Sequence, residues 1–273
     1  MELGIFSKTY SGDLESVFAS MRQDGLTSTQ FNLTSAGLET MPLTYDPNVI
    51  TKIKTTAEHY GIHLAALSGT FNMIDPDLNA REDGIQRFRV LCEIAQLLDI
   101  KVVSLCTGSK NPKSKWEWDD RNLSPEAWQD LIETTHRLIP MAERYDLILG
   151  VETEASNIVN TPQKARLLLD TINNDHLRII MDGANLFLPH QVNQMKPILK
   201  EAFGLLGKDI CLAHAKDLGA SDSLSFTAAG KGILDFDTYL DLMRKAHYDG
   251  PLILHGLSPQ QVSASVAFLK GKL

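Results

Sequence analysis

Short apolar or β-branched runs alternate with longer amphipathic segments along the whole chain. There are eight such runs, at residues 3–8, 28–33, 63–69, 101–108, 147–154, 178–185, 210–217 and 251–257. This alternation is typical of repeated βα units and predicts an α/β fold. Several runs are apolar without alternation, as in parallel strands that are covered on both faces. We therefore predict a (β/α)₈ TIM barrel, with an open doubly wound sheet as the alternative.

Residues that favour helix starts separate the predicted strands. Asp13 precedes the amphipathic segment 14–23, and Gly25 follows that segment as a stop signal. Three later segments each open with a hydroxyl residue followed by proline, at Ser124-Pro125, Thr161-Pro162 and Ser258-Pro259. The sequence contains no Pro/Gly/Ser-rich linker and no shift in composition. Residues 1–273 are therefore predicted to form a single TIM-barrel domain.

Composition and charge narrow the classes of partner. The 273 residues are 43% hydrophobic and 22% charged, which is ordinary for a globular chain. No apolar run approaches the roughly 18 residues of a membrane span, and the N-terminus does not resemble a secretory signal, so we expect a cytoplasmic protein with no membrane partner. A net charge of −8 without a Lys/Arg cluster argues against nucleic acid. Cys92, Cys106 and Cys211 are too scattered for a disulfide framework or a CxxC metal site.

Polar side chains follow the last four predicted strands, at the barrel end where such folds place their catalytic residues. A carboxylate between apolar neighbours needs a partner or a metal, and Glu, Asp and His together suit a divalent ion such as Mn²⁺, Mg²⁺, Co²⁺ or Zn²⁺. We predict one such ion; ion pairs and hydrogen-bonded core positions are the alternative roles. The candidate ligands are Glu152, Asp182, His214 and His255, while Lys216 is a catalytic candidate and Glu154 and Asn185 are candidates for substrate binding.

Residues near the ends of the first four predicted strands are candidates for contact with a substrate. Lys8 and Gln30 follow the first two strands, Asn72 follows the third, and Trp116 lies in the long loop after the fourth. Surface hydration is the alternative role for Lys8 and Gln30, and packing beneath the loop is the alternative for Trp116. The glycine pair in AAGKGILDF is weak evidence for phosphate binding, because no P-loop accompanies it.

Five motifs in order carry a family resemblance: GVETE, IIMDGANL, AHAKD, AAGKGILDF and GPLILHGL. They resemble the xylose isomerase-like barrel superfamily, the sugar phosphate isomerase/epimerase group, most strongly over residues 147–257. The resemblance implies a metal held by Glu152, Asp182 and His214. The fourth ligand in that superfamily is usually a glutamate on the eighth strand, where this chain has His255.

The resemblance also implies a reaction: isomerisation or epimerisation of a ketose or related small carbohydrate. In the ketose 3-epimerases of the superfamily, two metal-bound glutamates exchange a proton beside the carbonyl through a metal-stabilised enediolate. Here the pair would be asymmetric, Glu152 and His255, with Lys216 hydrogen-bonding to the substrate. A homo-oligomer is expected on the same ground.

Other functions remain open at this stage. A dehydratase or lyase acting on a keto-polyol, similar to inosose or dehydroshikimate dehydratases, would use the same metal site. A non-catalytic carbohydrate-binding barrel would fit if His255 abolished metal binding. An endonuclease for abasic DNA is set aside, because the related enzyme uses several metals and many more histidines, and this chain is acidic.

Overall fold

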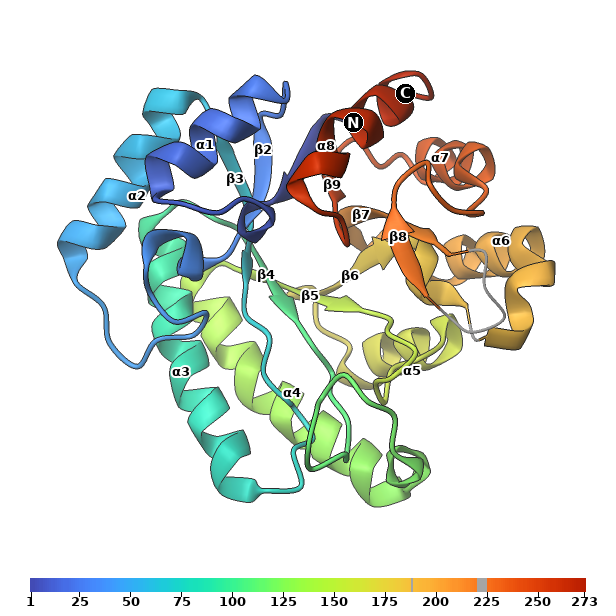
Figure 1. The fold of residues 1–273 in the computed structure, drawn as a ribbon. Coiled ribbons are helices and arrows are strands. Elements are labelled where there is room, and N and C mark those ends of the chain that lie inside the picture. Colours follow the sequence, from blue (N-terminus) through green and yellow to red (C-terminus); the bar gives the residue numbers. More distant parts are fainter. Residues whose placement is uncertain (188, 220–224) are drawn as a thin grey trace.

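The structure, a computed structural model, describes residues 1–187, 189–219 and 225–273. Within these residues, eight parallel strands close into a barrel, because β6 pairs with β7 and β9 pairs with β1 (Figure 1). The strands are β1 (Leu3–Phe6), β2 (Ser28–Phe31), β3 (His63–Ser68), β4 (Val102–Leu105), β5 (Ile148–Glu152), β6 (Leu177–Asp182), β7 (Ile210–Leu218) and β9 (Leu252–Leu254). The predicted TIM barrel is confirmed, and the open sheet is excluded.

Eight α-helices in the described part of the chain surround the barrel (Figure 1). The predicted helix starts are confirmed: Asp13, Ser124 and Thr161 each accept a hydrogen bond from a backbone N–H of the first turn, and Ser258 forms a capping box with Gln261. No described helix is long and apolar enough to cross a membrane. The helices are α1 (Leu14–Gln23), α2 (Pro47–Tyr60), α3 (Leu78–Leu97), α4 (Pro125–Tyr145), α5 (Pro162–Ile172), α6 (Met195–Leu206), α7 (Phe236–Lys245) and α8 (Pro259–Lys270).

One strand was not expected from the sequence. β8 (Phe226–Ala228) pairs antiparallel with the end of β7 and forms a hairpin beside the barrel mouth. Its three residues lie in a polar segment with no apolar run, so hydrophobic periodicity gave no signal. Most of the barrel strands are also shorter than predicted, because their polar ends leave the sheet and turn into the loops.

Two sets of buried apolar residues support the barrel. The larger set fills the space between strands and helices, and the smaller set fills the barrel interior with Phe6, Ala65, Ala66, Val102, Ile180, Leu212 and Ile253. The strand register then sets the polar residues above this interior. Asp182 pairs directly with His214, and His214 pairs with Ile253, two residues before His255. Three predicted site residues are thus brought to one side of the barrel mouth.

Candidate active site

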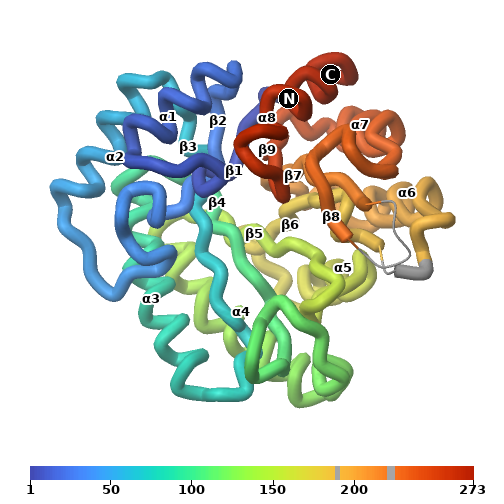
Figure 2. The backbone as a smooth tube through the Cα atoms, in the orientation of Figure 1, coloured from blue at the N-terminus to red at the C-terminus, as the bar shows by residue number. Residues whose placement is uncertain are grey.

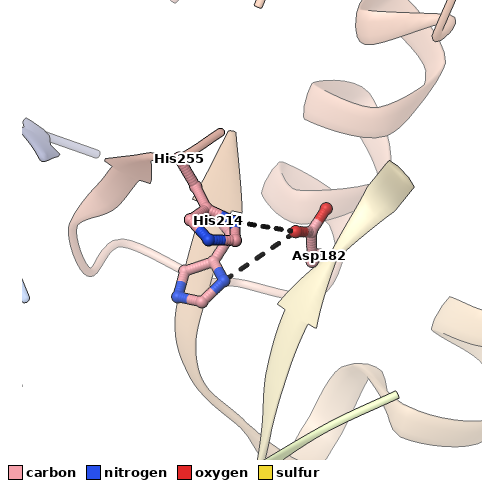
Figure 3. Close-up of side chains that lie close together, drawn as sticks. All are labelled: Asp182, His214 and His255. Atoms are coloured by element: carbon pink, nitrogen blue, oxygen red, sulfur yellow. Dashed lines mark ion pairs between the residues drawn. The ribbon is translucent and has the colours of Figure 1, made fainter. Parts of the chain in front are cut away.

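Asp182 at the end of β6, His214 in the middle of β7 and His255 directly after β9 form a compact cluster. One ligating atom from each lies within 4.8 Å of the others. Nδ1 of His214 lies 3.9 Å from Oδ2 of Asp182, and Nδ1 of His255 lies 3.7 Å from the same oxygen. Both rings therefore face one carboxylate oxygen (Figure 3). Both distances are too long for hydrogen bonds.

The two oxygens of Asp182 have different partners. Oδ1 accepts a hydrogen bond of 2.9 Å from the backbone N–H of Ala184, at the start of the short 3₁₀ helix Gly183–Leu186. Oδ2 is buried and has no hydrogen-bond partner among the described residues, and the same holds for Nδ1 of His255. Buried polar atoms are rarely left in this state. The Lys216 ammonium lies 3.4 Å from Oδ2 without forming a hydrogen bond to it, so two polar atoms without hydrogen bonds face each other across 3.7 Å, as the ligand atoms of a metal would.

His214 is oriented by Gln30 from across the barrel. Nε2 of His214 lies 2.8 Å from the amide oxygen of Gln30, while the amide nitrogen of Gln30 donates to the hydroxyl of Ser104 over 3.0 Å. These contacts place a ring hydrogen on Nε2, so in the neutral ring the lone pair of Nδ1 faces Asp182 and Glu152. Histidine ligands of metals are commonly held in this way, with the second ring nitrogen donating to a fixed acceptor.

The spacing of these atoms fits a divalent ion. Ligands about 2.1 Å from an ion stand about 3.0–3.4 Å apart in octahedral or tetrahedral geometry. Oε1 of Glu152 lies 3.4 Å from Nδ1 of His214, and the Asp182 separations are only slightly larger. An acceptor oxygen facing an acceptor nitrogen is unfavourable unless a cation lies between them. The residues present therefore fit a metal.

Asn185 connects the other polar residues of the site. Its amide nitrogen donates to Glu152 over 2.6 Å and to Glu154 over 2.9 Å, and its amide oxygen accepts from Lys216 over 2.6 Å. The Lys216 ammonium also lies 3.4 Å from Oδ2 of Asp182 and 3.8 Å from the centre of the Phe226 ring. One buried amide thus fixes two carboxylates and one ammonium relative to each other.

Charge and burial shift the pKa values in this network. Burial, reinforced by the charges of Glu152 and Asp182, raises the pKa of Glu154 to about 7. Burial would lower the pKa of Lys216, but the surrounding carboxylates outweigh it and raise that pKa. Burial also lowers the pKa of His255, although Asp182 opposes the shift. His255 is therefore neutral at pH 7, which is the state that binds metals.

A cavity of about 400 Å³, which we call the reactive cavity, opens above this network. The cavity is lined by Glu152, Glu154, Lys216 and His255. Two aromatic rings, Phe6 and Phe226, also line it, and neither was among the predicted site residues. Phe6 stacks on His255 with ring centres 4.6 Å apart, and Phe226 covers Lys216. Phe6 could have been selected from the sequence, because it lies two residues before Lys8 near the end of the first predicted strand. No sequence pattern pointed to Phe226.

The structure places the remaining predicted residues at different distances from this cavity. Lys8 is exposed at the rim and Trp116 is half exposed at the far side, and both line the reactive cavity. Gln30 is buried and lines the same cavity from below. Asn72 lies outside it, with its amide bound to the backbone of Ser109 by two hydrogen bonds.

The two glycines of AAGKGILDF, Gly230 and Gly232, bind the Asp217 carboxylate and not a phosphate site. The backbone N–H groups of Gly230 and Gly232 donate to Oδ2 of Asp217, and that of Leu234 donates to Oδ1. Asp217 thereby occupies the donors that a phosphate would need. The glycines serve this close approach, since a Cβ on Gly232 would lie 2.0 Å from the carbonyl oxygen of Leu218.

Fold and site together define the class of protein. The profile of the xylose isomerase-like TIM barrel family matches residues 18–272. The chain therefore belongs to this family, as the resemblance indicated. No curated protein sequence gives a significant match.

Three solved structures with the same fold are distant in sequence. 3-Keto-D-glucoside 4-epimerase from E. coli has a TM-score of 0.76 at 16% identity, covering 99% of both chains. The IolI protein with a bound zinc atom has a TM-score of 0.77 at 17% identity, covering 100% of this chain and 96% of that one. The probable 3-DHS dehydratase AsbF from Bacillus anthracis has a TM-score of 0.77 at 12% identity, covering 99% of both chains.

Proposed function

We propose that the protein is a divalent-metal-dependent isomerase or epimerase that moves a proton next to the carbonyl of a ketose or related small carbohydrate. The observation that carries the proposal is the buried Oδ2 of Asp182, which has no hydrogen-bond partner among the described residues and faces two imidazole nitrogens below the reactive cavity. A sugar epimerase has the same fold, and three of the four ligands that the resemblance implies, Glu152, Asp182 and His214, are present here, with His255 in the place of the fourth.

Asp182, His214 and His255 would hold the ion, with Glu152 as the fourth ligand. The two nitrogen ligands favour zinc, cobalt or manganese over magnesium. When bound, the ion would supply Lewis-acid polarisation of the substrate carbonyl. Tyr239 supports the arrangement from beneath, because its hydroxyl donates to the carbonyl oxygens of Met181 and His214.

Glu152 and His255 would handle the proton. They flank Asp182 and His214, at the ends of β5 and β9, and both line the reactive cavity. Glu152 would take the proton from the carbon beside the carbonyl. His255 would return a proton to that carbon from the other side of the substrate. Lys216, held charged by its carboxylate neighbours, would donate a hydrogen bond to a substrate oxygen. Glu154, Asn185, Asn72, Trp116, Lys8 and Gln30 stay proposals as substrate-binding residues.

The test is exchange of a carbon-bound proton with solvent. The protein is loaded with Zn²⁺, Co²⁺ or Mn²⁺ in D₂O and incubated with D-fructose, D-tagatose, D-psicose and an inosose, while NMR follows loss of the C–H signals beside the carbonyl. We expect exchange with at least one sugar, reduced at least about 100-fold in Glu152→Gln. Failure to bind any of these metals, or exchange that persists in Glu152→Gln, would contradict the proposal.

A dehydratase is the second candidate, since His255 replaces a carboxylate and could protonate a departing hydroxyl. Mass spectrometry of the product separates the two reactions, because elimination removes one water and isomerisation leaves the mass unchanged. Assembly into a homo-oligomer and a cytoplasmic location stay predictions.

A further inference from the structure

A second cavity of about 490 Å³ adjoins the reactive cavity, and we call it the outer cavity. It lies among the loops after β2, β3 and β4 and the first turns of α3. Thr70 and Trp116 line both cavities, so the two share a wall. Each exceeds the roughly 300 Å³ at which small-molecule sites begin.

The outer cavity lies opposite the metal-ligand cluster. In the order of the eight barrel strands, β3 stands opposite β7 and β4 stands opposite β9. β7 and β9, which carry His214 and lead to His255, thus lie on one side of the mouth, and the loops after β3 and β4 lie on the other. Figure 2 shows the course of these strands and loops. A sugar whose carbonyl lies at the cluster would direct its far end toward Thr70 and Trp116.

Hydrogen bonds fix the shared wall in position. The Lys115 ammonium donates to the carbonyl oxygen of Thr70 over 2.9 Å, and the amide of Asn157 donates to the carbonyl oxygen of Lys115 over 2.9 Å. These bonds join the loops after β3, β4 and β5 through Lys115, the residue before Trp116. The backbone at Trp116 is therefore fixed, and its side chain, 52% exposed, presents an aromatic surface where the two cavities meet.

The lining of the outer cavity suits a neutral polyhydroxy ligand. Thr40, Asp75 and Asn111 supply polar groups, and Trp116 and Phe71 supply flat apolar surface. Of the three basic side chains that line the cavity, those of Arg87 and Lys115 are bound to other groups and only that of Lys113 is exposed. Arg87 is bound by Asp83, Glu39 and the carbonyl oxygen of Met41, and Lys115 is bound by Thr70. A phosphate would need such groups free.

We propose that the outer cavity is a second sugar subsite, and that the substrate is a ketose-containing disaccharide or glycoside. The keto sugar lies in the reactive cavity and the second sugar lies beyond Trp116 in the outer one. This inference rests on the proposed function, because it assigns the carbonyl to the metal-ligand cluster.

The test fills the outer cavity without touching the reactive one. Ala80, exposed in the first turn of α3, lines only the outer cavity of the two, and Ala80→Trp would obstruct it. The neighbouring exposed residue Asn79 lines neither cavity, so Asn79→Trp is the matched control. Zinc-loaded proteins are titrated with D-fructose and with three ketose disaccharides, maltulose, isomaltulose and lactulose, and binding is followed by saturation-transfer NMR.

We expect at least one disaccharide to bind about tenfold or more tightly than D-fructose. Ala80→Trp should remove this advantage and leave D-fructose binding unchanged, and Asn79→Trp should preserve both. The subsite is wrong if no disaccharide binds more tightly than D-fructose, or if Ala80→Trp keeps the advantage. Because exchange with the monosaccharides tests the proposed function separately, the subsite can fail while that function stands.

Discussion

Gln30 lies beside His214 at the base of the reactive cavity, with its amide oxygen on Nε2 and its amide nitrogen on Ser104. A side chain in this position controls which nitrogen of the imidazole carries the hydrogen. It therefore acts on the proposed metal through His214, although it also lines the cavity.

Replacing Gln30 by Met should weaken metal binding about 10- to 100-fold, because Nε2 of His214 would lose its acceptor and the ring its fixed orientation. Competition with a chromophoric chelator measures the affinity. Ser104→Ala is the control, since it removes one of the two hydrogen bonds that the Gln30 amide nitrogen donates, keeps the one to Ser68, and leaves the contact with His214 in place. Equal affinity in Gln30→Met and wild type would remove Gln30 from the metal site.

The sequence identifies some of these residues and cannot identify others. Asp182 and His214 follow apolar runs, so the alternation of βα units is enough to bring them to the same barrel end. The partnership of Gln30 and His214 spans 184 positions and depends on the barrel diameter. The bridging position of Asn185 depends equally on side-chain directions that no local pattern specifies.

At the scale of elements, the hairpin of β7 and β8 depends on the Asp217 carboxylate. Asp217 follows Lys216 directly, and three backbone N–H groups between Gly230 and Leu234 converge on its oxygens. The hairpin carries Phe226 over Lys216, so the loop anchor also shapes the cavity. The sequence did not predict β8, because its three residues carry no apolar run and the contacts of Asp217 join positions 13 to 17 residues apart.

Gly232→Ala should destabilise the protein by about 1–3 kcal/mol, because the added Cβ meets the carbonyl oxygen of Leu218 and the Asp217 carboxylate. Urea unfolding measures the change. Lys231→Ala, one residue earlier and exposed, should have no measurable effect. If both variants unfold at the same urea concentration as wild type, the close packing of this loop is not important for stability.

At the scale of the whole molecule, metal binding should couple to folding, since the proposed ligands come from β5, β6, β7 and the end of β9 and are assembled only in the closed barrel. Zn²⁺ at about 100 times its Kd should add about 2.7 kcal/mol and raise Tm by roughly 5–10 °C. Calorimetry with and without chelator measures the shift. A rise of the same size in Asp182→Asn would place the ion elsewhere.

The barrel closes where its last strand, β9, pairs with its first, β1 (Figure 1). Of the barrel strands, β1 is synthesised first and stays without this partner until β9 is made, so the edges of β1 and β7 are unpaired until then. His255 follows β9 by one residue. The same short stretch therefore completes the sheet and the ligand cluster, so an unfinished chain has neither, and the proposed activity can begin only once the fold is whole.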